Sequence, residues 1–196
     1  MAANQDIAIV VLAAGRSARF GTADKLAAPF GDSTVLAAAL CAYQNLPAAH
    51  HYLIVAPHSN FAVTARAAGF DVLVNAQADE GMGSSIACGM RAVLAANPAP
   101  SHVLIGLGDM PRIAPATLVA LCHRANNKTD IIVPTWRGKR GHPRLFGAAH
   151  FTALANLHGD KGARALVSGS RAVTEVEGDA GIIADIDTID DLARLS

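Results

Sequence analysis

The chain has 196 residues, enough for one domain or one domain with a small lobe, and its hydrophobic content of 52% provides for a sizeable core. Sixteen basic side chains balance sixteen acidic ones, which argues against a general nucleic-acid-binding protein, so any recognition of phosphate groups has to be local. The amino-terminal segment lacks the basic cluster of a signal peptide, and no stretch approaches the ~20 apolar residues of a membrane helix. The three cysteines show no pairing pattern, which suits the reducing cytoplasm. We therefore expect a cytoplasmic protein, and, without a membrane helix, no membrane partner.

Runs rich in Val, Ile and Leu alternate with helical patterns through the first two thirds of the chain. This alternation predicts a single α/β domain with a Rossmann-like, mostly parallel sheet and helices on both faces. Helix starts are expected at Ser33 or Thr34, at Asn60, and at Ser84 or Ser85, because these side chains can cap a first turn. In chain order the predicted elements are strand 7–14, helix 33–46, strand 52–57, helix 60–69, strand 71–75, helix 84–97, strand 102–109, helix 114–127 and strand 130–136.

The last third of the chain is more polar and contains more glycine. Residues 137–147 are expected to form a loop or hairpin that runs into a strand at 144–147, followed by a short helix at 149–157 and a turn at 158–164. A strand at 172–177 and a helix at 188–195 complete the chain. No linker divides it, so we expect one domain over 1–196, with an excursion near 137–170 that faces a substrate.

The segment GRSARFGTADK (15–25) directly follows the first predicted strand. In an open α/β sheet, ligands bind beyond the carboxyl ends of the strands, where this loop lies. Gly15 and Gly21 would let backbone N–H groups approach an anion, while Arg19 and Lys25 can bind phosphate groups. The loop is neither G-x-G-x-x-G nor a P-loop, so a dinucleotide is a poor fit. A solvated basic turn is the alternative interpretation.

The segment LAAGRSARFGTADKL (12–26) resembles the signature L-A-A-G-x-S-x-R-x-G-x-x-K of the molybdenum cofactor cytidylyltransferase-like (MobA/MocA-like) nucleotidyltransferases, with one extra residue before Lys25. In the further segments named below, three residues depart from those usual in this family, namely Met110, Arg144 and Ile189. The resemblance implies the nucleotide-diphospho-sugar transferase fold, with a nucleotide-binding half at about 1–110 and an acceptor-binding half at about 111–196. It continues in GMGSSIACGM (81–90), GLGDMP (106–111), RGHPRLF (140–146), LHGDKGAR (157–164) and DIDTIDDL (185–192).

Asp109 follows a buried strand and precedes Met110-Pro111, so its carboxylate is expected at the carboxyl end of the sheet. A turn-forming aspartate is the alternative, but the resemblance implies a ligand of Mg²⁺, which takes one or two protein carboxylates and completes its shell with phosphate oxygens and water. The second carboxylate is expected from Asp185 or Asp187, which share a face if the segment is extended, with a slight preference for Asp185.

The resemblance also implies which residues hold the nucleotide. Arg19, Lys25 and Asp109 would be catalytic, with Arg19 nearest the β- and γ-phosphates and Lys25 nearest the α-phosphate. The segment LAAG, rather than the LAGG of related guanylyl enzymes, favours CTP over GTP. The expected nucleotide-binding residues are Leu12, Ala13, Ala14, Gly15, Arg19, Lys25, Asn75, Ser84, Ser85, Gly89 and Asp109.

A second cluster of polar residues is expected to bind the acceptor. His142 lies among Lys139, Arg140 and Arg144, and this cationic cluster suits an acceptor with a terminal phosphate, although a loop histidine is as often plain surface. Asp160 and Arg164 can line the same pocket, or can simply brace a tight glycine turn.

The expected activity is Mg²⁺-dependent transfer of CMP from CTP to the terminal phosphate of molybdenum cofactor (molybdopterin), with release of pyrophosphate. A molybdoenzyme that receives the product is an expected partner, and nucleic acid is not. One alternative is the same chemistry with GTP, or with a sugar or alcohol phosphate as acceptor. Another, of a different class, is a non-catalytic carrier or insertion chaperone for the cofactor.

Overall fold

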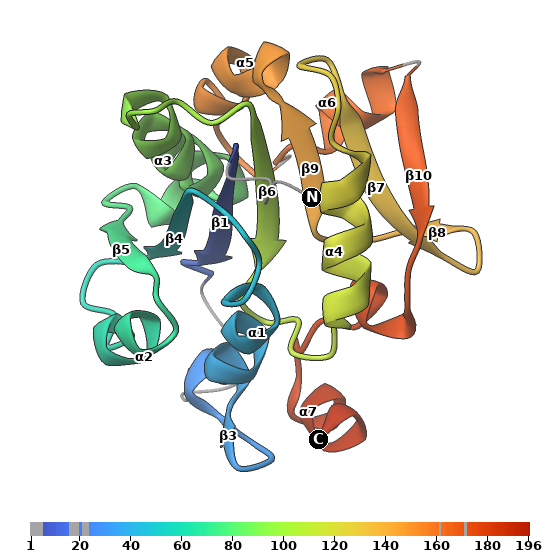
Figure 1. Ribbon diagram of the computed structural model, residues 1–196. Helices are drawn as coiled ribbons and strands as arrows, with labels where there is room; N and C mark the ends of the chain where they lie inside the picture. The colour runs from blue at the N-terminus through green and yellow to red at the C-terminus, as the bar shows by residue number, and fades with distance from the viewer. Residues whose placement is uncertain (1–5, 16–19, 21–23, 161, 171) are drawn as a thin grey trace.

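The computed structural model describes residues 6–15, 20, 24–160, 162–170 and 172–196. In these residues an eight-stranded sheet has the order β10-β7-β9-β6-β1-β4-β5, with β8 paired to the carboxyl-terminal end of β7 (Figure 1). A two-stranded ribbon, β2 (Pro29–Phe30) with β3 (Ser33–Thr34), lies apart from it. The strands of the main sheet are β1 (Ile7–Ala13), β4 (His50–Val55), β5 (Asp71–Val74), β6 (His102–Leu107), β7 (Ile131–Trp136), β8 (Lys139–Arg140), β9 (Arg144–Gly147) and β10 (Val173–Glu177).

Helices cover both faces of the sheet, as the sequence predicts. The α-helices are α1 (Val35–Tyr43), α2 (Ala62–Ala67), α3 (Met82–Ala95), α4 (Pro115–Arg124), α5 (Phe151–Ala155), α6 (Arg164–Gly169) and α7 (Ile189–Leu195). Single turns of 3-10 helix occur at η1 (Lys25–Ala27), η2 (Ala78–Glu80), η3 (Ala148–His150) and η4 (Ala180–Ile183). Among the described residues, no helix is both long enough and apolar enough to cross a membrane.

Strand β1 lies at the centre and explains the two-layered core. All seven of its residues are buried, and successive side chains point to opposite faces of a strand. Ile9 and Val11 pack into a cluster with α1, α2 and α4, whereas Val10 and Leu12 pack into a second cluster with α3, α5 and α6. Because both faces are covered, the strand is a continuous apolar run.

The order of the strands places a crevice at the end of β1. The chain runs outward from β1 to β4 and β5, all parallel, and then returns to β6 on the other side of β1. Such a reversal opens a crevice beyond the carboxyl ends of the two strands, where ligands bind in open α/β sheets. Among the described strands of the main sheet, only β9 and the short β8 run antiparallel to their neighbours, so the prediction of a mostly parallel sheet is confirmed.

Several local predictions are wrong, for identifiable reasons. Thr34 does cap α1, but α2 begins after Phe61 without a side-chain cap, so Asn60 is not its cap. Helix α3 begins at Met82, two residues before the predicted serines, because Gly81 adopts a positive φ of 102° and turns the chain into the helix. Helix α6 begins at Arg164, the last residue of the predicted turn, and continues through residues to which the sequence assigned no element.

Candidate active site

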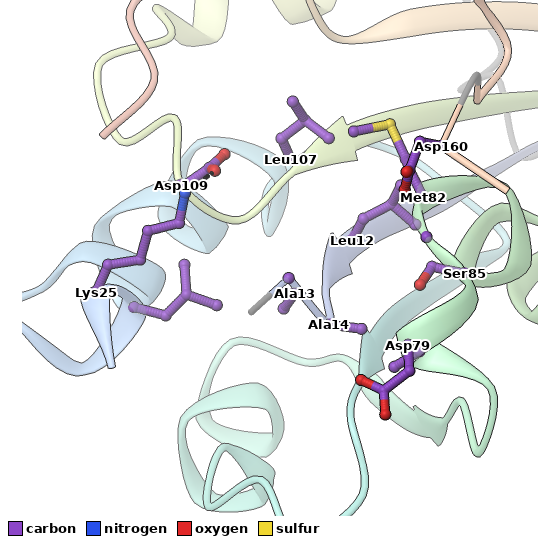
Figure 2. A pocket seen from close by; sticks show the side chains of 14 residues that line it. Leu12, Ala13, Ala14, Lys25, Asp79, Met82, Ser85, Leu107, Asp109 and Asp160 are labelled. Atoms are coloured by element: carbon purple, nitrogen blue, oxygen red, sulfur yellow. Dashed lines mark hydrogen bonds and ion pairs between the residues drawn. The ribbon is translucent and has the colours of Figure 1, made fainter. Parts of the chain in front are cut away.

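A cavity of about 500 Å³ opens at the carboxyl ends of β1 and β6 (Figure 2). The end of β1 supplies small residues and bare backbone, so a ligand can approach the main chain closely. Charged side chains stand at opposite ends of the cavity, with Lys25 and Asp109 at one end and Asp79 near Ser85 at the other. The lining residues are Leu12, Ala13, Ala14, Gly15, Lys25, Leu26, Ala78, Asp79, Gly81, Met82, Ser85, Leu107, Asp109 and Asp160.

At one end of this cavity, Lys25 lies between two carboxylates. Its Nζ donates to Oδ2 of Asp109 and to Oδ1 of Asp187, each at 2.7 Å. The lysine stands on η1, which Asp24 caps by accepting a hydrogen bond from the backbone N–H of Leu26, and Leu26 is itself buried in the core. The lysine backbone is therefore anchored beside the sheet.

Two backbone hydrogen bonds place Asp109 and Asp187 together. The N–H of Gly108 donates to the carbonyl of Leu12, which holds the end of β6 against the end of β1. The N–H of Ile186 donates to the carbonyl of Asp109, and the Ile186 side chain is fully buried. Asp187, the next residue, is thereby brought beside Asp109, although 78 positions separate them in the sequence.

Burial and charge act in opposite directions at this cluster. Burial disfavours the charge on Lys25, but Asp109 and Asp187 outweigh it and raise the pKa of the ammonium above its ordinary value. For Asp109, burial raises the pKa of the carboxyl group, Lys25 opposes the rise, and nearby Asp185 adds to it. The lysine therefore stays protonated, and removing it would leave a buried carboxylate beside two other acids.

The donor set at this end fits a divalent cation of the Mg²⁺ or Mn²⁺ kind. Oδ1 of Asp109 is buried and hydrogen-bonds to no other residue that the structure describes, so it has unused capacity to accept. Asp109 and Asp187 supply two hard oxygen ligands. The described residues contain no group of three His, Cys, Asp or Glu side chains that could hold a metal ion alone. Mg²⁺ ordinarily takes few protein ligands and completes its shell with phosphate oxygens and water.

The other end of the cavity is organised by hydrogen bonds around Asn75. The Asn75 side chain donates to Oγ of Ser84 at 2.9 Å and to Oγ of Ser85 at 3.1 Å. Ser84 in turn donates to backbone carbonyls of the loop before α3, so its hydroxyl is used inside the protein. Ser85 faces the cavity, and its hydroxyl proton has no acceptor among the described residues, which leaves it available to a ligand.

The remaining nucleotide-binding predictions fall in three different places. Arg19 and Gly21 lie outside the described residues. Asn75 and Ser84 are buried behind the cavity wall. Gly89 lies in the core, where a Cβ would come 2.6 Å from Cγ1 of Val10, so it permits close packing of α3 on the sheet. The predicted residues that do line the cavity are Leu12, Ala13, Ala14, Gly15, Lys25, Ser85 and Asp109.

Sequence reasoning missed several residues that line this cavity, among them Asp79, Met82 and Asp160. Asp79 lies on η2 and Met82 opens α3, immediately around the GMGSS segment that the sequence did single out. Asp160 reaches the cavity because the N–H of Gly83 donates to the carbonyl of Gly159, which ties the 158–160 loop to the start of α3. Gly81 has to be glycine here, since a Cβ would collide with Asp160. The sequence offers two signals for these residues, since Asp79 lies two positions before GMGSS and Asp160 belongs to the LHGDKGAR segment.

A second cavity of about 210 Å³ adjoins the first. The two share Leu12, Met82 and Asp160 as lining residues. The structure brings together here all four residues that the sequence predicts for acceptor binding: His142, Arg144, Asp160 and Arg164. The apolar lining comes from both sheet and helix, with Ile86, Ile105 and Phe146.

The second cavity is cationic. Burial lowers the pKa of the Arg144 guanidinium, and the neighbouring Arg164 and Arg140 lower it further. The Nε–H of Arg144 donates to the backbone carbonyl of Gly141, which is a neutral acceptor. Burial, with help from Arg144, lowers the pKa of His142 to about 3, so the imidazole is neutral at ordinary pH. Its Nδ1 is buried and unpartnered among the described residues.

Comparison with known proteins identifies the family. The MobA-like NTP transferase domain matches residues 9–176. Rv0371c from Mycobacterium tuberculosis H37Rv is 36% identical, with a TM-score of 0.79 and 97% of each chain covered. A homologue of Rv0371c from Mycobacterium sp. strain JC1 is 30% identical, with a TM-score of 0.80 over 99% of this chain and 96% of that one.

A manganese complex of Rv0371c, 34% identical with a TM-score of 0.76 over 97% of each chain, shows that a divalent metal binds to a relative. The search among curated proteins found no significant match. These likenesses span nearly the whole chain and agree with the single α/β domain described above. The chain therefore belongs to the MobA-like NTP transferase family.

Proposed function

We propose that this protein transfers CMP from CTP to the terminal phosphate of molybdenum cofactor (molybdopterin) and releases pyrophosphate. The observation that carries the proposal is the pair of adjoining cavities, one with the Lys25–Asp109–Asp187 cluster and one with two arginines. An acceptor phosphate oxygen forms a bond to the α-phosphorus of CTP as the bond to the β-phosphate oxygen breaks. Two substrates must meet for this step, and two cavities that share a wall allow it.

The polar groups of the first cavity suit a nucleoside triphosphate. Lys25 would bind the α-phosphate, and Arg19, outside the described residues, would bind the departing phosphates. Asp109 and Asp187 would hold Mg²⁺, which neutralises phosphate charge when it is bound. Asp185, which is exposed and close to Asp109, would interact with the ion's water shell rather than with the ion directly.

The far end of the first cavity suits a base with an exocyclic amine. Ser85 accepts from Asn75 and can therefore donate its own proton to a ring carbonyl. Asp79, across the same end, can accept from the amine. Cytosine offers both groups, a carbonyl and an amine on either side of ring atom N3, and guanine carries a comparable pair around N1. The LAAG segment, whose two alanines line the cavity, adds the family-based preference for CTP over GTP.

The second cavity would bind the acceptor. Arg144 and Arg164 would hold an acceptor phosphate, and the neutral His142 can exchange a hydrogen bond with the pterin part through Nδ1. Asp160, at the shared wall, would accept hydrogen bonds from ring N–H groups. Product would pass to a molybdoenzyme in the cytoplasm, a location that the three free cysteines favour.

Pyrophosphate release tests the proposal. The purified protein is incubated with Mg²⁺, each of CTP, GTP, ATP and UTP, and either molybdopterin or a panel of sugar and alcohol phosphates. Release with CTP and molybdopterin, absent in Asp109→Asn, is the expected result. Preference for GTP would move the assignment to guanylyl transfer, and activity only with sugar phosphates would overturn the acceptor. Tight cofactor binding without any pyrophosphate release would establish a carrier.

A further inference from the structure

We propose that Lys25 is an internal cation that holds the metal position between Asp109 and Asp187, and that it leaves this position for the nucleotide phosphates when a divalent metal binds. This inference rests on the proposed role of Asp109 and Asp187 as metal ligands. It does not depend on which nucleotide or which acceptor the protein uses.

The geometry makes lysine and metal compete for the same place. Nζ of Lys25 is within 2.7 Å of one oxygen from each carboxylate, and only 11% of the lysine side chain is exposed. Mg²⁺ binds oxygen at about 2.0–2.1 Å, so an ion held by those same two oxygens needs the space that the ammonium fills. Two cations in contact there would also repel each other strongly.

The Lys25 side chain can reach a second position inside the first cavity. The lysine backbone is anchored through the Asp24 cap and the buried Leu26, but its four-carbon side chain is flexible and also lines the first cavity. Displaced from the carboxylates, Nζ can turn into that cavity without any change in the fold. Phosphate oxygens that bind there replace the two carboxylates as its partners.

This exchange of Lys25 for a metal ion would couple the binding of the metal to the binding of the nucleotide. Without nucleotide, a metal ion has to displace an ammonium from two close ion pairs, so metal binding is weak. With nucleotide, the displaced ammonium gains phosphate partners, so each ligand strengthens the binding of the other by the same factor. Lys25 also offsets part of the negative charge of the two close carboxylates while no metal is bound, which weakens their mutual repulsion.

The decisive experiment measures the affinity for Mn²⁺ alone, from the electron paramagnetic resonance signal of free Mn²⁺, with no nucleotide present. Lys25→Met has nearly the shape of lysine without its charge. We expect it to bind Mn²⁺ roughly 10- to 100-fold more tightly than the wild type. Lys25→Arg keeps a cation and should stay as weak as the wild type. Lys128→Met, at an exposed lysine outside the cavities, is the matched control and should change nothing.

A second measurement on the unmutated protein covers the case in which Lys25→Met does not fold. The chain has four lysines, so their ¹⁵N-labelled ammonium groups can be assigned individually. Mg²⁺ alone should shift or broaden the Lys25 signal while the signals of Lys128 and Lys139 stay in place. An unchanged Lys25 signal at a Mg²⁺ concentration that saturates the protein would overturn the exchange.

The outcomes separate this inference from the proposed function. If Asp109→Asn and Asp187→Asn fail to weaken Mn²⁺ binding in the Lys25→Met background, the metal site itself is wrong. If they weaken it but Lys25→Met binds Mn²⁺ no more tightly than the wild type, the exchange is wrong while the metal site stands. Neither result depends on pyrophosphate release, which reports on the reaction alone.

Discussion

The two adjoining cavities differ in how their charges are balanced. In the first, Lys25 lies between Asp109 and Asp187, and Asp79 and Asp160 add negative charge, so the described lining is acidic overall. In the second, Arg144 and Arg164 stand beside a neutral His142, and Asp160 is the one acidic residue in the lining that the structure describes. Under the proposed function, the first cavity would take a polyphosphate together with a divalent metal, whereas the second would hold an anion through its arginines.

The strongest test of this difference is the loss of the Asp109 carboxylate. Asp109→Asn keeps the shape of the side chain but removes a buried charge that pairs with Lys25 and would bind the metal. We expect turnover to fall by about 10³-fold or more, because charge stabilisation at the reacting phosphates is lost. The measurement is kcat from pyrophosphate release. Asp32→Asn, at an exposed turn, is the control. Near-normal turnover would refute a metal role for Asp109.

The second cavity is tested by removing one of its cations. Arg144→Ala should raise KM for the acceptor by roughly 10-fold or more and leave KM for CTP unchanged, because a charge-assisted hydrogen bond to phosphate contributes about 1.5–3 kcal/mol. Arg91→Ala, at an exposed arginine of α3, should alter neither constant. A matching rise in KM for CTP would mean that the two cavities do not divide the substrates as proposed.

The neutral state of His142 predicts a pH dependence of stability. The unfolded chain takes up this proton near its ordinary pKa of 6.5, whereas the folded protein takes it up only at about 3. Between these values the unfolded state binds more protons, so the free energy of unfolding falls as the pH falls, by up to about 1.4 kcal/mol per pH unit.

His142→Asn removes this titration from the folded and the unfolded state alike. Denaturant unfolding at pH 7, 6 and 5 should therefore give a shallower loss of stability in the variant than in the wild type. His123→Asn, at an exposed histidine, should keep the wild-type slope. Equal slopes for His142→Asn and the wild type would show that the imidazole is not held neutral.

The smallest effect is expected at Gly89, which was predicted to bind the nucleotide but lies in the core outside the first cavity. Gly89→Ala adds a Cβ close to Val10, which overpacks the core, while the gain in helix propensity offsets part of the loss. We expect the free energy of unfolding to fall by roughly 1 kcal/mol with KM for CTP unchanged. Gly169→Ala, where a Cβ meets no atom, should not destabilise the protein. A raised KM would return Gly89 to the nucleotide site.

Much of the fold was predictable because its signals are local. The buried strands are apolar runs of a few residues, and their alternation with helices needs only near neighbours in the sequence. The start of α3 was not predictable, because it depends on the positive φ of Gly81 and on contact with the distant Asp160 loop. Helix α6 is short and follows two glycines, so its pattern is too brief to distinguish from a turn.

The candidate site likewise combines residues that the sequence indicated with contacts that only the fold could decide. Residue type and position after a strand made Lys25 and Asp109 candidates for binding phosphate and metal, and the family resemblance added the metal role and the DIDT carboxylates. The sequence favoured Asp185 over Asp187, yet the hydrogen bond from Lys25 goes to Asp187. Which carboxylate reaches the lysine depends on how the buried Ile186 seats the segment, and no local pattern encodes that.

By itself, the sequence determined the α/β class, the order of the elements and the residue types offered at the carboxyl edge of the sheet. Only the tertiary structure decided that Lys25 meets a residue 84 positions away and another 162 positions away. It also decided that Asp160 stands in the wall between two cavities. Local patterns arise from neighbouring residues, whereas contacts at such separations form only when the packed core brings the strand ends together.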